Sequence, residues 1–74
     1  METGCVKWFH KTKGYGFIQT KQGQTFFVHF SNLNMKGYKS LDAGQKVQFE
    51  IVENARGLQA INVTKIYSWY NPNS

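Results

Sequence analysis

The amino-acid sequence predicts an all-β domain in which five short strands close into a small barrel. The chain has 74 residues, enough for one small domain. Several segments show the period of two that is typical of strands, because successive side chains in a strand point to opposite faces. No segment keeps the 3.6-residue period of a helix over three turns. The expected strands cover residues 4–10, 15–20, 25–30, 46–52 and 59–66.

The first three strands are expected to form an antiparallel meander, since short polar turns containing glycine separate them. Val6 is the expected inward residue of the first strand. Trp8 and Phe9 follow as neighbours, so they cannot both face the core of a regular strand.

The second and third strands each divide into two faces. Tyr15 and Phe17 share one face of the second strand, and Phe27 and His29 share one face of the third. The opposite faces are apolar and are expected to form the core, with Gly16, Ile18, Phe26, Val28 and Phe30. An exposed aromatic face requires an explanation, and flat rings beside lysines suit stacking on unpaired bases.

The second half of the chain completes the predicted barrel. Periodicity is lost over 31–44, which indicates a long loop with room for one short helical turn. The fourth strand then alternates strictly. The residues expected to point inward from the last two strands are Val47, Phe49, Ile51, Ile61 and Val63. Five strands with one long third connection suit an OB-type barrel, whose closure leaves few bare strand edges.

Positive charge is concentrated in the aromatic half of the chain. The net charge is +5, and no Asp or Glu occurs from Thr3 to Leu41, a stretch that contains six lysines. Basic residues interleaved with aromatic ones indicate a nucleic-acid partner. The alternative is an ordinary solvated lysine surface.

Several other classes of function find no support in the sequence. The single cysteine, Cys5, cannot form an intramolecular disulfide and fits a reducing interior. With no leader and no apolar run of membrane-spanning length, the chain is expected to be cytoplasmic, without a membrane partner. Cys5, His10 and His29 lack metal-ligand spacing, and no catalytic constellation is visible. We therefore expect no enzymatic activity, no metal and no cofactor.

Six motifs together resemble the signatures of the cold-shock domain family, in register over residues 4–66. They are Lys7-Trp8-Phe9, Lys13-Gly14-Tyr15-Gly16-Phe17-Ile18, Phe27-Val28-His29-Phe30-Ser31, Gly37-Tyr38-Lys39-Ser40-Leu41, Ala43-Gly44-Gln45 and Gln59-Ala60-Ile61-Asn62-Val63. The resemblance implies an OB barrel that binds single-stranded DNA and RNA with little sequence preference, as a nucleic-acid chaperone or stress-related regulator. Three segments, Met1 to Gly4, Met35 to Tyr38 and Gln45 to Phe49, resemble the D-type cold-shock-like proteins in particular. Those proteins are associated with stationary phase, replication inhibition and dimers.

The resemblance also implies which residues contact the nucleic acid. Stacking rings and their neighbours map onto Trp8, Phe9, Tyr15, Phe17, Phe27, His29, Phe30 and Tyr38, and polar or basic contacts map onto Lys7, Lys13, Lys39, Arg56 and Gln59. His10, which follows the first motif, is a further expected contact. Each aromatic could instead belong to the core, and Phe9 and Phe30 in particular could be half-buried at the barrel edge. No residue is identifiable as a reader of the 2′-hydroxyl, so both DNA and RNA remain open.

The chain departs from the family pattern at four positions. His10 stands where the family usually has asparagine, and Thr25 stands where it has aspartate. Phe26 takes the place of the usual valine, and Leu58 takes the place of the usual proline. An aspartate at position 25 would offer an acceptor to a base edge and a negative charge near Lys7, Lys13 and the phosphates. Its loss predicts tighter and less selective binding.

Two alternatives and one segment remain open. The aromatic face could serve a protein-interaction barrel that binds proline-rich peptides. An RNA-recognition-motif fold shares the Lys-Gly-Tyr-Gly-Phe run but needs two helices that this chain cannot supply. The expected domain covers 1–67, and the tail 68–74, together with Tyr67, either packs against the barrel or contacts a second subunit. The protein is thus expected to be a monomer or a weak homodimer.

Overall fold

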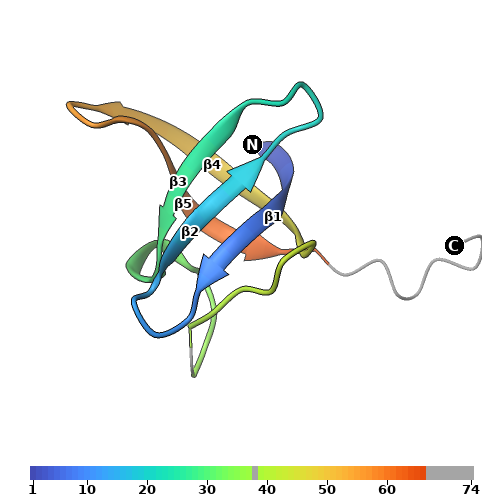
Figure 1. Ribbon diagram of the computed structural model, residues 1–74, viewed down its shortest axis with the longest axis vertical. Coiled ribbons are helices and arrows are strands. Elements are labelled where there is room, and N and C mark those ends of the chain that lie inside the picture. The colour runs from blue at the N-terminus through green and yellow to red at the C-terminus, as the bar shows by residue number, and fades with distance from the viewer. Residues whose placement is uncertain (38, 67–74) are drawn as a thin grey trace, which may run out of the picture.

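The computed structural model describes residues 1–37 and 39–66 as a closed five-stranded barrel (Figure 1). The elements are β1 (Glu2–His10), β2 (Tyr15–Gln19), β3 (Thr25–His29), the 3-10 helix η1 (Phe30–Asn32), β4 (Lys46–Asn54) and β5 (Gly57–Lys65). The strands follow the order β1-β2-β3-β5-β4 around the barrel. The predicted all-β OB-type barrel is therefore confirmed.

Pairing is antiparallel throughout the barrel except at one seam. The β1–β2–β3 meander and the β4–β5 hairpin are antiparallel, and β1 also pairs antiparallel with β4. The seam between β3 and β5 is parallel and aligns Phe27 with Gln59. Figure 1 shows β1, β2 and β3 side by side on one side of the barrel, with the turn of the β4–β5 hairpin reaching beyond it.

The core consists of apolar side chains that the strands and the long loop direct inward. Its buried members are Val6, Ile18, Phe26, Val28, Leu33, Leu41, Val47, Phe49, Ala60 and Val63. Leu33 and Leu41 come from the segment in which no periodicity was found. Leu33 forms a parallel bridge with Val63, so this part of the loop packs beside β5.

Three residues expected to point inward do not belong to the buried core. Ile51 is 39% exposed, since the hairpin that carries it extends past the barrel (Figure 1). Ile61 is only half-buried and pairs with the exposed Glu50, while Ala60 is buried in its place. Asn62 has a positive φ of 51°, which interrupts the alternation between Ala60 and Val63.

Phe30 is the third exception, because β3 ends one residue before it. His29 caps η1 through its side chain, and Phe30 begins that helix with 44% of its surface exposed. The anticipated helical turn thus exists, but it starts immediately after β3. Within the described part of the chain, no helix is long and apolar enough to cross a membrane.

Tyr38 and the predicted tail lie outside the described residues. The proposed boundary at residue 67 and the contact of the tail with a second subunit therefore stay predictions.

Candidate nucleic-acid interface

A row of three aromatic rings crosses the outer face of β1, β2 and β3. The register aligns Trp8 with Phe17 and Phe17 with Phe27, and the parallel seam adds Gln59 on β5. The ring centroids of Trp8 and Phe17 are 5.4 Å apart, and those of Phe17 and Phe27 are 5.8 Å apart. Both pairs meet edge to face, a favoured arrangement of aromatic rings.

A second row lies parallel to the first, nearer the β1–β2 turn. It aligns His10 with Tyr15 and Tyr15 with His29. The Tyr15 ring joins the two rows, with its centroid 5.9 Å from that of Trp8 and 6.0 Å from that of Phe27. The outer-face placement predicted by alternation for Tyr15, Phe17, Phe27 and His29 is what the structure has, and all four side chains are half-buried.

A β-bulge places Trp8 on this face. Val6 is buried opposite Ile18, but the register then shifts so that Trp8 lies opposite Phe17. Lys7 is the extra residue, and it is exposed like Trp8, whose surface is 41% accessible. Without the bulge, the alternation that buries Val6 would also turn Trp8 inward.

Phe9 lies on the other side of the strand from Trp8. It pairs with Gly16 and packs, partly buried, against the core. A Cβ on Gly16 would lie 2.7 Å from the Cα of Phe9, so the missing side chain permits this close approach. Its role as a stacking ring is thus not supported by this geometry, which matches the half-buried alternative.

The His29 and Phe30 rings form a separate pair at the end of β3, with centroids 4.5 Å apart. The Nδ1 atom of His29 accepts from the backbone N–H of Ser31 at 3.3 Å and lies 2.8 Å from its Oγ. Because Nδ1 is the acceptor, the neutral ring carries its N–H at Nε2. Phe30 rests against Gly14, whose carbonyl accepts from the Phe30 N–H at 2.8 Å.

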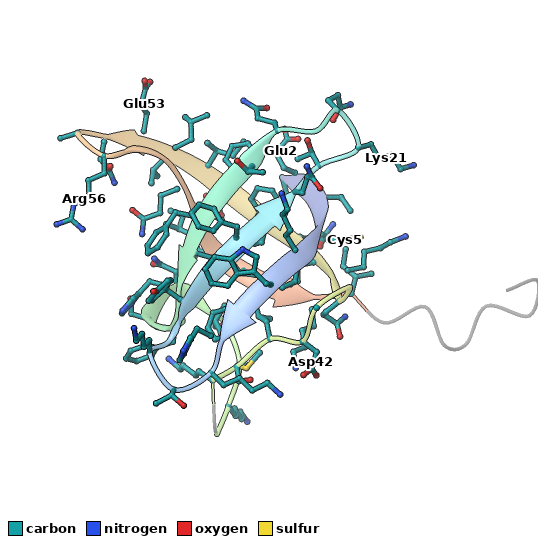
Figure 2. All side chains as sticks on the ribbon, in the orientation of Figure 1. Glu2, Cys5, Lys21, Asp42, Glu53 and Arg56 are labelled. Atoms are coloured by element: carbon teal, nitrogen blue, oxygen red, sulfur yellow. The ribbon has the colours of Figure 1, made fainter. Side chains whose placement is uncertain are left out.

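A groove of about 550 Å³ extends the aromatic face between β3 and the β4–β5 hairpin. Its lining includes Phe27, Thr25, Leu58, Gln59 and Arg56. The Gln59 Oε1 accepts from Asn54 Nδ2 at 2.8 Å, which orients this amide. Figure 2 shows Arg56 at the outer end of the hairpin. The groove therefore brings two predicted contacts, Arg56 and Gln59, next to the ring rows.

A second groove, of about 560 Å³, lies between the β1–β2 turn and the loop after η1. Phe30 and Lys39 both line it, together with Thr12 and Gly14. The structure thus brings Lys39 into the same groove as an exposed ring. Lys13 is exposed in the adjoining turn.

Ser31 and Asn54 orient His29 and Gln59, although neither is among the predicted site residues. Neither residue belongs to a periodic pattern. A hydroxyl two residues after the histidine and an amide before the Ala-Arg-Gly turn are the local signals that could have marked them.

Thr25 lies far from one of the lysines expected beside it. The register pairs Thr25 with Gln19 at one end of β3 and His29 with Tyr15 at the other. Lys13 precedes Tyr15, so it belongs to the opposite end of the strand pair from Thr25. The expectation that Thr25 neighbours Lys13 is therefore wrong, and the cation that shares its groove is Arg56.

An ion pair joins the β1–β2 turn to the loop before β4. Lys11 Nζ lies 2.8 Å from Asp42 Oδ1, and both side chains are more than half exposed. The hydrogen bond from Lys11, reinforced by its positive charge, lowers the pKa of Asp42 below its ordinary value of 3.8. Lys11 lines the second groove. The negative charge of Asp42 beside it is therefore paired with a positive one.

These observations define a class of protein: a small β-barrel with a continuous, partly exposed aromatic face bordered by cations. Among the described residues, no group of three or more His, Cys, Asp or Glu side chains could hold a metal ion. The family model for the 'Cold-shock' DNA-binding domain matches residues 2–66. The chain belongs to this family, whose members are nucleic-acid-binding, non-enzymatic proteins.

Individual relatives and one solved structure agree with this assignment. The chain is 56% identical to cold shock-like protein CspLB of Listeria monocytogenes over 66 residues, which covers 89% of this chain and 100% of the relative. It is 55% identical to cold shock protein CspC of Bacillus subtilis over 88% of this chain and 98% of that protein. The solved structure of Drosophila Unr CSD456 matches 99% of this chain and 28% of its own length, with 26% identity and a TM-score of 0.71.

Proposed function

We propose that this protein binds single-stranded DNA and RNA with low sequence specificity by stacking unpaired bases on the first ring row and on Tyr15 and His29 of the second. The observation that carries the proposal is the register of Trp8, Phe17 and Phe27 across three adjacent strands. Rings that are held by their neighbours and remain partly exposed offer ready surfaces for bases. Base–aromatic stacking contributes about 1–3 kcal/mol per base and tolerates any sequence.

Positive charge and stacking have separate roles in this proposal. Lys7 and Lys13, beside the rows, and Lys39 and Arg56, in the two grooves, attract the phosphates. The rings then select the unpaired state, because the faces of bases in a duplex are already stacked on one another. Binding at the rows therefore requires strands that are single or have been opened.

Fluorescence of Trp8 tests the proposal directly. A Trp69→Phe variant leaves Trp8 as the remaining tryptophan, and it is titrated with a single strand and with the corresponding duplex. We expect quenching by single-stranded DNA and RNA, and little quenching by the duplex. Equal quenching by both forms, or none by the single strands, would contradict the proposal.

A finer function follows from preference for the unpaired state. We propose that the protein acts in the cytoplasm as a nucleic-acid chaperone that holds RNA or DNA segments open, with a stress-related role and, as in D-type relatives, inhibition of replication. The test is the melting temperature of an oligonucleotide hairpin with and without protein. A lowered melting temperature with wild-type protein, but not with Phe27→Ala, is the expected result.

A further inference from the structure

His10 extends the second ring row to the β1 edge of the aromatic face. Its side chain is exposed, and its ring centroid lies 6.2 Å from that of Tyr15, with the two ring planes 18° apart. The two rings are thus nearly parallel, unlike the edge-to-face pairs in the first row. His10 and His29 flank Tyr15 on either side in register.

The orientation of the His10 ring is held by the turn that follows β1. Its Nδ1 accepts a hydrogen bond from the backbone N–H of Lys13 at 3.1 Å. The same turn is closed by the bond from the Gly14 N–H to the His10 carbonyl at 2.7 Å. An imidazole held at Nδ1 and packed beside Tyr15 retains little rotational freedom, so it loses little entropy when a base stacks on it.

We propose that His10 forms an additional base-stacking position. With it, the site accommodates one nucleotide more than the other rings of the two rows can hold. This inference rests on the proposed single-strand binding and adds to it the extent of the site. The ring supplies the stacking surface. Its Nε2–H, which the bond at Nδ1 leaves as the donor of the neutral ring, is available to an acceptor on the added nucleotide.

The test measures affinity for single strands that are lengthened one nucleotide at a time. His10→Asn removes the ring but keeps a side-chain oxygen that can accept from a backbone N–H in the turn. His10→Phe keeps an aromatic ring and removes the acceptor. Thermal unfolding of both variants confirms that each remains folded under the conditions of the titration.

We expect the affinity of wild-type protein to rise with length and then reach a plateau. His10→Asn should reach its plateau one nucleotide earlier, with roughly 5-fold weaker final binding, the lower end of the range for one stacked base. His10→Phe should keep the wild-type plateau length. An unchanged plateau in His10→Asn, or a shortened one in His10→Phe, would overturn the inference.

Failure of the inference can be told apart from failure of the proposed function. If single strands quench Trp8 and His10→Asn nevertheless keeps the wild-type plateau, only the additional position is wrong. If single strands fail to quench Trp8 in the protein that carries His10, the proposed function itself is wrong.

Discussion

Phe27 occupies a central place on the aromatic face. Its ring contacts Phe17 in its own row and Tyr15 in the other, and its side chain also lines the groove that contains Arg56. A base stacked on Phe27 would therefore lie between the rows and the groove. His29, whose ring is oriented by Ser31, lies on the same strand two residues away.

Phe27→Ala and His29→Ala should each weaken binding of a single-stranded oligonucleotide by about 1–3 kcal/mol. The fold should remain, because both side chains lie on the outer face and outside the buried core. Ile51→Ala serves as the control, since it truncates an exposed apolar residue on β4, a strand that carries neither row. Fluorescence titration measures the affinities. Unchanged affinity in both variants would contradict the proposal that bases stack on the ring rows.

Gly14→Ala should reduce both stability and binding. A Cβ there would lie 2.5 Å from Cδ2 of Phe30, and the residue has a positive φ of 79°. The left-handed conformation costs a non-glycine residue about 1–2 kcal/mol, and the clash would displace the exposed Phe30 ring. Urea unfolding and oligonucleotide titration measure the two effects.

Gly23→Ala is the matched control for Gly14→Ala. Gly23 has a similar φ of 85°, but an added Cβ would meet nothing within 4 Å. This variant should lose a comparable amount of stability from strain and bind normally. If Gly14→Ala bound as well as Gly23→Ala, Phe30 would not need its place on Gly14 for binding.

At the scale of elements, β1 contributes side chains to both the core and the aromatic face. Its bulge at Lys7 shifts the alternation of inward and outward side chains by one residue. Val6, before the bulge, belongs to the core, and Trp8, after it, belongs to the ring rows. Phe9 then continues the inward phase and packs against the core. A single strand thus supplies both buried apolar area and an exposed tryptophan.

The Lys11–Asp42 ion pair connects the β1–β2 turn to the loop before β4. Because the folded-state pKa of Asp42 is lowered, the pair stabilises the fold above the unfolded pKa of about 3.8. That stabilisation is lost as the pH falls through the lower folded-state value. Asp42→Asn should therefore be less stable than wild type near neutral pH, and the two should converge in acid.

Urea unfolding at a series of pH values from neutral to acid measures the difference in the free energy of unfolding between Asp42→Asn and wild type. Glu53→Gln, which neutralises an exposed carboxylate at the far end of β4, is the control (Figure 2). A stability difference for Asp42→Asn that persisted unchanged into strong acid would show that the charge of the carboxylate is not its cause.

Thr25→Asp should weaken binding modestly at low salt, and the loss should shrink as the salt concentration rises. An aspartate at the start of β3 would share a groove with Arg56 and Phe27 and repel phosphates there. Exposure limits the effect to roughly 1 kcal/mol or less. Gln24→Asp, with the same charge one residue earlier in the exposed turn, is the control. Tighter binding to every homopolymer would mean that a regained base acceptor outweighs repulsion.

For the whole molecule, the net charge of +5 predicts binding that depends strongly on salt. Each phosphate neutralised on a single strand contributes about −0.7 to the slope of log K against log salt. If Lys7, Lys13, Lys39 and Arg56 each contact one phosphate, the slope should be roughly −3. Lys7→Gln should reduce its magnitude, whereas Lys46→Gln, on β4, should not. An affinity that did not change with salt concentration would instead favour a barrel that binds a protein partner through its aromatic face.

The sequence by itself determined the outer face of β2 and β3. Alternation is a local property of a strand, so Tyr15, Phe17, Phe27 and His29 could be placed without knowing what surrounds them. The strand count and the closed barrel followed from the same local pattern and from the position of the long loop. The family resemblance added Trp8, Lys39, Arg56 and Gln59 to the site.

Tertiary structure alone decided features that depend on contacts between distant segments. The bulge at Lys7 turns Trp8 outward. Because β3 ends before Phe30, that ring is exposed to solvent on one side and lies next to Gly14 on the other. Leu33 and Leu41 enter the core although their loop has no periodicity. Burial depends on which neighbours cover a side chain, and the chain's local pattern does not contain that information. For the same reason, the parallel seam that brings Gln59 beside Phe27 emerges only when the barrel closes.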